Sequence, residues 1–364
     1  MFIQSGLRRL AALFGLAIGI GVPVQSAQAW DHPGHMTTAA IAFAEIERAR
    51  PDLIDKIGLL MLKHPEPAPF WVAAGDGKGK ERARHMFIEA GRWPDDAKFT
   101  AHDRPTWHTA RWTIIADDAP AEAKALVEAR GGKPIGNALE ALALNAAIVS
   151  NPESKPEERA LALSWMMHVV GDIHQPLHVS DLVSEDFPTG NAAGTLGYVW
   201  DPLRDSAMPL HLLWDSNTRR STKLEDVDGY AKEIMEQYPR SSLPELAAFE
   251  GSDDFEKWAK ESHEVAVDWA YDIETIPDPN LDADSDRVVG NMVKYILEGI
   301  SPVEEAPAVP DEYWEKLQEA VPRRMALAGY RIADIILSAA DRLDAERTLS
   351  GKVLDSMQRH GPTN

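Results

Sequence analysis

The segment HVVGDIHQPLH, from His168 to His178, decides how this chain is expected to fold. His168 and Asp172 are four residues apart, so on a helix their side chains leave the same face, one turn apart, in a geometry that can chelate a metal. Pro176 breaks that helix and lets His178 turn back towards the pair. His174, two residues beyond Asp172, should point elsewhere. The segment therefore predicts a ligand-bearing helix and the turn that ends it.

A second pair with the same spacing occurs further along the chain, in the string HLLWD. His211 and Asp215 are again four residues apart, so on a helix they too share one face. One such pair could arise by chance. Two pairs, together with His178, indicate a polynuclear metal site.

Helical periodicity dominates the sequence, because apolar residues recur at three- and four-residue spacing and alternating, strand-like runs are nearly absent. This pattern predicts an all-α, single multi-helix domain with ligands that converge from several helices. Two stretches rich in proline and aspartate, Asp181 to Arg204 and Ile276 to Arg287, are expected to be surface loops, and residues 350–364 a polar, flexible tail. The expected helices are Thr37 to Arg48, Ala121 to Ala129, Ile135 to Val149, Pro156 to Val170, Val227 to Tyr238, Phe255 to Tyr271, Val288 to Leu297 and Asp311 to Leu343.

The first 29 residues have the features of a secretory signal. Arg8 and Arg9 form its positive region, Leu10 to Val22 its apolar stretch, and Ala27-Gln28-Ala29 a small-x-small cleavage site. The apolar stretch is too short for a spanning anchor, and the residues around the two arginines favour ordinary secretion over a twin-arginine signal. We therefore expect a secreted or periplasmic protein without a membrane anchor, whose mature domain begins at Trp30 and extends to residue 349.

The composition narrows the possible chemistry. Without cysteine the chain has neither disulfides nor thiolate ligands, so a metal must bind to His, Asp, Glu, backbone or water. Such a ligand set suits zinc, with manganese or iron as alternatives. The formal net charge is −21, and loss of Arg8 and Arg9 with the signal would make it −23. This is opposite to the basic surface that grips long nucleic acid, so bound cations would have to supply positive charge at a phosphate site.

Two further elements add candidate ligands. Cleavage before Trp30 would free an α-amine five residues before His35, and a terminal amine and carbonyl can together chelate a metal. Asp95 lies in the string RWPDD, and His108 follows at short range in the string TWH. Each of these signals is weak alone, and they become informative only together with the other motifs, in their order along the chain.

In this order, the motifs resemble the S1/P1 family of secreted, trinuclear zinc nucleases, which is related to the zinc-dependent phospholipases C. The family pattern is a mature N-terminal Trp with a His five residues on, a Trp-x-Asp, a lone His, HxxGDxHQPLH and HxxWD. The chain has all five between Trp30 and Asp215. The short gap from Trp30 to His35 and the final Asp215 favour the nuclease branch, because in the phospholipase branch that gap is longer and the last ligand is Glu.

The resemblance implies three zinc ions. It assigns to one ion the side chains of Asp95, His108, His168 and Asp172. It assigns to a second ion the Trp30 amine and carbonyl, His35, and Asp172 as a bridging residue. It assigns to a third ion the side chains of His178, His211 and Asp215. Each ion would keep open positions for water and phosphate oxygens, and the cluster would lower the pKa of a shared water.

The reaction implied by the resemblance is hydrolysis of phosphodiester bonds in single-stranded DNA or RNA, with removal of 3'-phosphate from nucleotides as a further activity. The sequence leaves two alternative functions open. The same cluster could serve a phospholipase C or another phosphodiesterase, or the chain could be a non-catalytic zinc-binding protein. No stable protein partner is implied.

The chain departs from the family pattern after the lone His108. Acidic residues are usual three and five positions further on, where this chain has Arg111 and Thr113. The guanidinium fork of Arg111 suits a phosphate contact, although a surface position is the commoner role of an arginine. Thr189-Gly190-Asn191 is a reduced Gly-Gly-Asn string, in which Asn191 either contacts substrate or serves as a turn residue. The nucleobase-stacking residues of the family cannot be placed on this sequence.

Overall fold

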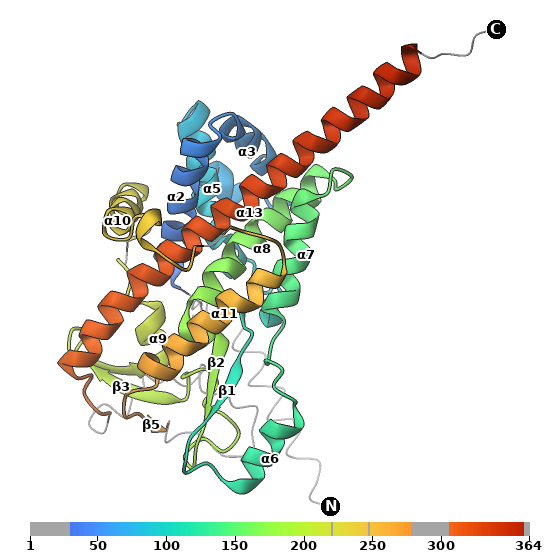
Figure 1. Cartoon of the computed structure of the whole chain (residues 1–364). Coiled ribbons are helices and arrows are strands. Elements are labelled where there is room, and N and C mark those ends of the chain that lie inside the picture. Colours follow the sequence, from blue (N-terminus) through green and yellow to red (C-terminus); the bar gives the residue numbers. More distant parts are fainter. Residues whose placement is uncertain (1–29, 220, 247, 278–305, 360–364) are drawn as a thin grey trace, which may run out of the picture.

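The computed structural model describes residues 30–219, 221–246, 248–277 and 306–359, with side chains up to residue 346. Over these residues the chain is mostly helical, which confirms the predicted fold class. Figure 1 shows the helices packed around α8 and α13, with the C-terminal end of α13 extending beyond the others. Among the helices described, none combines the length and the apolar character needed to cross a membrane. The expected secretory signal and the expected helix Val288 to Leu297 lie outside the described residues.

The elements follow one another along the chain in this way. The longer helices are α2 (His32–Ala49), α3 (Leu53–Met61), α4 (Ala68–Ala74), α5 (Gly79–Asp96), α6 (Ala121–Ala129), α7 (Ala138–Ser150), α8 (Pro156–His174), α9 (Leu210–Asp215), α10 (Leu224–Gln237), α11 (Asp253–Val265) and α13 (Asp311–Arg359). Short helical turns are η1 (Pro105–His108), η2 (Pro176–Val179), η3 (Arg240–Ser242) and η4 (Ala266–Ala270). The strands are β1 (Trp112–Ile115), β2 (Ser180–Val183), β3 (Gly197–Asp201), β4 (Ser206–Pro209) and β5 (Ile276–Pro277).

Most predicted helices are present, with ends shifted by a few residues. The helix predicted for Phe255 to Tyr271 is α11 followed by the π-helical turn η4. Helices α3, α4 and α5 were not predicted. In α5 the first half is rich in charged residues, and Pro94 lies in the last turn, where it removes a hydrogen-bond donor without ending the helix earlier. Helix α13 continues to Arg359, beyond the predicted end at Leu343 and into the segment expected to be a tail.

Helix α8 lies at the centre of the fold because its sequence is apolar on all sides. Every residue from Ala162 to His174 is buried, as expected for a helix without a polar face. Helix α8 packs against α5, α7 and α13, and apolar side chains of these helices form one core cluster. A second core cluster joins α2, α9, α10 and the N-terminal part of α13. The ligand candidates on α8 are therefore held in the protein interior.

A buried charge cluster fixes the C-terminal end of α8. His174 donates from Nδ1 to the Val170 carbonyl at 2.7 Å and accepts from Arg331 of α13 at 2.9 Å. Arg331 also donates two hydrogen bonds of 2.7 Å to Glu261 of α11. Because Arg331 is almost fully buried, this pairing with Glu261 keeps its charge compensated in the core. His174 is thus engaged with α13 and not with the ligand candidates, in agreement with the prediction from its position.

Two small sheets were not predicted, because their strands are too short to show an alternating pattern. β1 pairs with β2 in parallel, and β3 pairs with β4 and β5 in antiparallel fashion. The segment Asp181 to Arg204 therefore carries β2 and β3 and is largely buried, so the expectation of a surface loop was wrong. Asn191 provides a hydrogen-bond acceptor for part of the buried backbone of this segment. Its Oδ1 accepts from the N–H groups of Leu182 and Gly194 at 3.2 and 3.0 Å.

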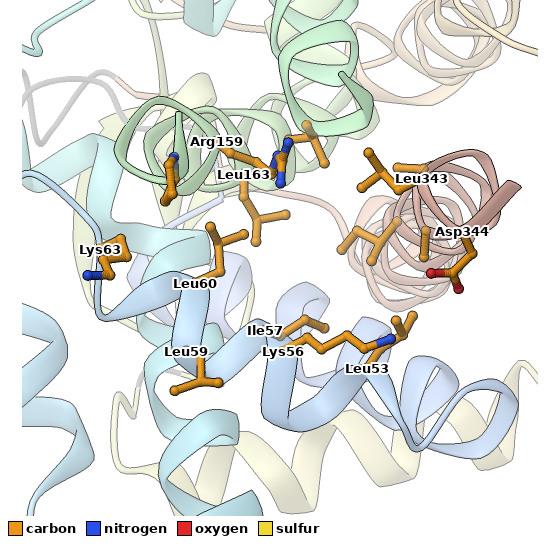
Figure 2. A pocket seen from close by; sticks show the side chains of 15 residues that line it. Leu53, Lys56, Ile57, Leu59, Leu60, Lys63, Arg159, Leu163, Leu343 and Asp344 are labelled. Atoms are coloured by element: carbon orange, nitrogen blue, oxygen red, sulfur yellow. The ribbon is translucent and has the colours of Figure 1, made fainter. Parts of the chain in front are cut away.

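An apolar groove of about 410 Å³ lies between α3, α8 and the C-terminal half of α13. Its lining is mostly aliphatic, and Figure 2 shows side chains from all three helices converging on it. Lys56, Lys63, Arg159 and Asp344 add charged groups to the lining. None of the predicted metal ligands lines this groove, so it is separate from the candidate site described next.

Candidate metal centre

His168 and Asp172 lie on one face of α8, one turn apart, and both are fully buried. His168 Nε2 is 3.5 Å from Asp172 Oδ1. His168 Nδ1 donates to the carbonyl of Gly91 in α5 at 3.0 Å, which leaves Nε2 as the ring nitrogen available to a metal. The backbone of α5 therefore fixes the orientation of this ligand candidate.

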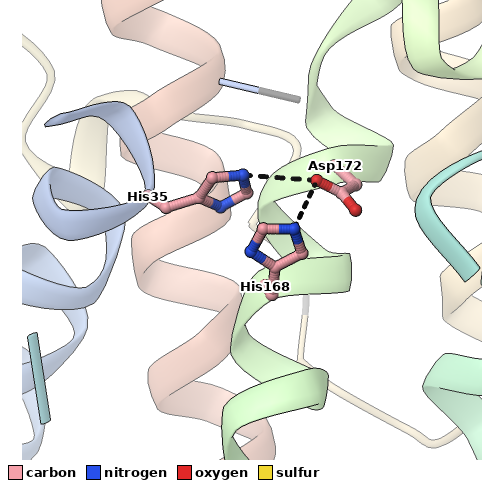
Figure 3. Close-up of side chains that lie close together, drawn as sticks. All are labelled: His35, His168 and Asp172. Atoms are coloured by element: carbon pink, nitrogen blue, oxygen red, sulfur yellow. Dashed lines mark ion pairs between the residues drawn. The ribbon is translucent and has the colours of Figure 1, made fainter. Parts of the chain in front are cut away.

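His35 of α2 forms a group of three with this pair (Figure 3). His35 Nε2 is 3.3 Å from Asp172 Oδ1, and its ring stacks on that of His168 with centroids 3.8 Å apart. Gly171 permits this approach, because a Cβ at that position would lie 2.7 Å from His35 Nδ1. One donor atom from each of the three residues lies within 4.8 Å of the others, a spacing that fits a single ion.

We expect Gly171→Ala to destabilise the protein and to weaken metal binding, because the added methyl group overlaps the His35 ring. In a helix, alanine is favoured over glycine by about 1 kcal/mol, whereas forcing a group into a packed interior costs about 1–3 kcal/mol. Gly229→Ala on α10 is the matched control, since a Cβ there meets no atom within 4 Å. Urea unfolding and zinc analysis of both variants check the prediction, which fails if Gly171→Ala stabilises as much as Gly229→Ala.

A second group is formed by Asp95 at the end of α5, His108 in η1 and His168. His108 Nδ1 lies 3.1 Å from both Asp172 Oδ2 and His168 Nε2, and His168 Nε2 is 3.8 Å from Asp95 Oδ1. Asp172 therefore directs one oxygen towards His108 and the other towards His35, so that its carboxylate lies between two groups. This is the position that a bridging ligand needs, and ligation itself stays a prediction.

The third group consists of His178, His211 and Asp215, whose donor atoms also lie within 4.8 Å of one another. His211 Nε2 is 3.2 Å from Asp215 Oδ2, one turn further along α9. Both histidines donate from Nδ1 to backbone carbonyls at 2.7 Å, His178 to that of His108 and His211 to that of Ala193. These hydrogen bonds direct each Nε2 towards the aspartate, as is common for histidines that bind metals.

The charge balance of the site favours a cation. Burial lowers the pKa of His168 to about 3, so this imidazole is neutral, the form that binds a metal. Burial, together with the nearby carboxylates of Asp31, Asp95 and Asp172, raises the pKa of Asp215 well above its usual value. A bound cation reduces the repulsion between carboxylates that lie close together in a buried site.

Several buried polar atoms of these residues lack a hydrogen-bond partner among the described residues. They include His35 Nδ1, both carboxylate oxygens of Asp95, His108 Nε2 and Asp215 Oδ2. Polar atoms that are buried and unsatisfied are costly, and in a native protein a group of them calls for an explanation such as a bound ion. Imidazole nitrogens and carboxylate oxygens are donors that zinc accepts. The donor set therefore fits zinc.

Trp30 lies beside these groups. Its side chain is fully buried, and the next residue, Asp31, donates its backbone N–H to the carbonyl of Asp215 at 3.1 Å. Asp31 Oδ1 accepts from the Gly34 N–H at 3.2 Å and so caps α2, the helix that carries His35. The backbone at Trp30 is thus held between α2 and α9. Chelation by its amine and carbonyl stays a prediction.

Arg111 and Asn191, the other predicted site residues, lie outside the three groups. Arg111 directly precedes β1, and its Nη1 lies 4.0 Å from Asp181 Oδ2 in β2. Asn191 is buried in the turn after β2, where its Oδ1 also accepts from the Tyr271 hydroxyl at 3.1 Å. This turn includes Ala193, whose carbonyl orients His211. A contact of Arg111 or Asn191 with substrate stays a prediction.

Lys98 is a residue of interest that the sequence reasoning missed. Its Nζ lies 3.4 Å from Asp95 Oδ1, yet it is buried without a hydrogen-bond partner in the part of the chain that the structure describes. An ammonium in such a position can bind an anion beside the metal ligands. The available signal was its spacing of three residues from Asp95 at the end of a helix.

Comparison with known proteins places these residues in a family. The sequence profile described as S1/P1 nuclease matches residues 30–341, a range that contains all three groups. Nuclease S1 of Aspergillus oryzae is 25% identical over 185 residues, which make up 49% of this chain and 54% of that protein. The chain thus spans about half the length of this curated relative. Because the family profile covers most of the sequence, the chain belongs to the S1/P1 nuclease family.

Proposed function

We propose that the chain is a secreted or periplasmic, zinc-dependent hydrolase that cleaves phosphodiester bonds in single-stranded DNA or RNA. The observation that carries this proposal is the convergence of three His/Asp groups in a member of the S1/P1 nuclease family. The name of its relative, Nuclease S1, indicates the same class of reaction. Removal of 3'-phosphate from nucleotides would use the same residues.

We infer three zinc ions, one for each group, and the zinc dependence of the family supports the choice of metal. Asp172 would be shared by the ions of the first two groups, and the Trp30 amine and carbonyl would complete the site at His35. The third ion would be held by His178, His211 and Asp215. When bound, zinc supplies Lewis acidity, which lowers the pKa of bound water and stabilises negative charge on the phosphate.

The protein's own groups orient the site and bind the phosphate. The Nδ1 hydrogen bonds of His168, His178 and His211 hold each ring in place. Lys98 would bind a phosphate oxygen. Its ammonium lies 3.4 Å from the candidate ligand Asp95 and makes no hydrogen bond among the described residues. Nearly all the ligand side chains are buried, so a flexible single strand can bring a phosphate to them more easily than a rigid duplex.

We propose that Arg111 contacts the substrate phosphate and that Asp181, 4.0 Å away, holds its guanidinium in place. Arg111→Gln is expected to raise the KM for an oligonucleotide roughly tenfold, as for a lost hydrogen bond to a charged group, and Arg111→Lys should fall between that variant and the wild type. Arg342→Gln, at an exposed position of α13, is the control. Steady-state kinetics with the same KM for wild type and Arg111→Gln would contradict this role.

The proposed function is tested on purified protein that begins at Trp30 and is loaded with zinc. We expect acid-soluble nucleotides to be released from single-stranded DNA or RNA, EDTA to abolish this release, and zinc to restore it. Cleavage that resists EDTA would contradict metal dependence. Release of phosphocholine from phosphatidylcholine without nucleotide release would indicate a phospholipase C instead. Full zinc occupancy without turnover of either substrate would indicate a zinc-binding protein without catalytic activity.

A further inference from the structure

Gln175 lies in the turn that follows α8 and joins two of the ligand groups. Its backbone N–H donates to the carbonyl of Asp172 at 3.0 Å, and its own carbonyl accepts from the His178 N–H at 3.0 Å. Pro176 favours this turn, because the residue before a proline is driven out of the helical conformation, and Gln175 has φ and ψ angles of −87° and 118°. The glutamine side chain is fully buried among the ligand candidates.

The hydrogen bonds of the Gln175 side chain allow one orientation of its amide. Oε1 accepts from the backbone N–H of Leu177. Because a backbone N–H can only donate, this contact fixes the oxygen on that side and turns the amide nitrogen the other way. Nε2 then donates to Asp215 Oδ1 of α9, and both hydrogen bonds are 2.5 Å long. The turn after α8 therefore presents a hydrogen-bond donor to a candidate ligand on another helix.

This hydrogen bond leaves the second oxygen of Asp215 for a metal. Asp215 Oδ2 lies 3.2 Å from His211 Nε2, and it is buried without a hydrogen-bond partner in the part of the chain that the structure describes. A donor on Oδ1 keeps the carboxylate from rotating, so Oδ2 stays directed at its group. A donated hydrogen bond also favours the charged carboxylate, which is the form that binds a metal. The two histidines of the group are held similarly, by backbone carbonyls.

We propose that Gln175 is a positioning residue for the third ion, which it affects by holding Asp215 in the orientation that a ligand needs. The proposal rests on the proposed function, because the third ion is part of it. Residues that hydrogen-bond to metal ligands typically contribute about 10- to 100-fold to metal affinity. The backbone of Gln175 is bonded to Asp172, so the same residue connects the third group to the helix that carries the first two.

The test is a zinc titration of protein that begins at Trp30 and has been stripped with EDTA, in competition with a fluorescent chelator. Gln175→Met keeps the length of the side chain but has no donor for Asp215. We expect it to lower the affinity for one of three ions by roughly 10- to 100-fold and to leave the other two unchanged. Gln237→Met on α10 is the matched control, because Gln237 is exposed and donates to the Tyr238 hydroxyl at 3.2 Å. It should change no affinity.

A double variant identifies the ion that Gln175 affects. His211→Ala removes a ligand candidate of the third group, so the protein should bind two ions. Adding Gln175→Met to His211→Ala should not change the affinity for these two, because the two substitutions act on the same ion. A further loss in the double variant would show that Gln175 supports the whole end of α8, and it would overturn the proposal.

Gln175→Glu separates the turn from the contact with Asp215. It keeps an oxygen that accepts from the Leu177 N–H, but its charged carboxylate cannot donate to Asp215 and repels it. We expect this variant to bind the third ion more weakly than the wild type as well. Urea unfolding in EDTA checks that each variant folds, and if Gln175→Met does not, Gln175→Glu decides the question.

Zinc binding is measured here without substrate, so its result does not depend on cleavage. Zinc affinities equal to those of the wild type in the Gln175 variants would overturn the proposal. A wild-type protein that binds three ions, loses affinity for the third through Gln175→Met and yet cleaves no single strand would support the role of Gln175 and overturn the proposed function. Cleavage by the wild type, together with unchanged zinc binding in both Gln175 variants, would support the function and overturn the role of Gln175.

Discussion

Replacing Asp172 by asparagine is expected to lower kcat/KM for single-stranded substrates by more than about 100-fold. Loss of a residue that only hydrogen-bonds to a metal ligand costs up to about 100-fold, and loss of a ligand itself should cost more. The carboxylate is fully buried, and its two oxygens face different histidines: Oδ1 lies 3.3 Å from His35, and Oδ2 lies 3.1 Å from His108. Asparagine has the same shape but offers one oxygen and no charge. It cannot serve both groups, so zinc content should fall together with activity.

Asp96→Asn is the matched control for this experiment. Asp96 lies next to the candidate ligand Asp95, yet it is exposed and paired with Arg92. Exposed ion pairs contribute little, so zinc content and turnover of this variant should stay close to those of the wild type. Zinc analysis by mass spectrometry and steady-state kinetics give the two readouts. An Asp172→Asn protein with full zinc content and activity would show that the two groups do not share this residue.

The centre of the site could be predicted because it depends on local spacing. His168 with Asp172, and His211 with Asp215, are each one helical turn apart, so any helix over these residues brings the pair to one face. The end of α8 follows from Pro176, because proline cannot continue the backbone hydrogen bonds of a helix. The family resemblance then supplied the candidates on α2, α5 and η1, whose signals are weak in isolation.

Contacts between distant segments could not be predicted in this way. Arg111 lies near Asp181 because β1 and β2 pair in parallel. These two strands have four residues each and are far apart in the sequence, so no local pattern predicts that they pair. Lys98 draws attention only once its ammonium is seen buried beside Asp95. At these positions tertiary structure, and not local propensity, decides what the residue can do.

A single residue retained before Trp30 is expected to remove one zinc ion and to lower activity by about 100-fold. This is the upper end of the loss that follows when groups supporting a metal site are removed. A free α-amine has a lone pair that a metal can accept, whereas a peptide nitrogen only donates a hydrogen bond. Trp30 is fully buried, and the Asp31 N–H is bonded to the Asp215 carbonyl at 3.1 Å. These contacts hold the backbone nitrogen of Trp30 in place, so an added residue converts the amine into a peptide nitrogen at the same position.

Three controls separate the loss of the amine from misfolding. Proteolytic removal of a cleavable N-terminal tag, which leaves Trp30 as the first residue, should restore both zinc and activity, and a tag after Asn364 should change neither. In EDTA, the tagged and cleaved proteins should unfold at the same urea concentration, because the cap that Asp31 provides to α2 is the same in both. Three zinc ions and full activity in the tagged protein would contradict the amine as a ligand. Two ions before cleavage and three after it would instead show that the free amine of Trp30 is needed to bind one of the three ions.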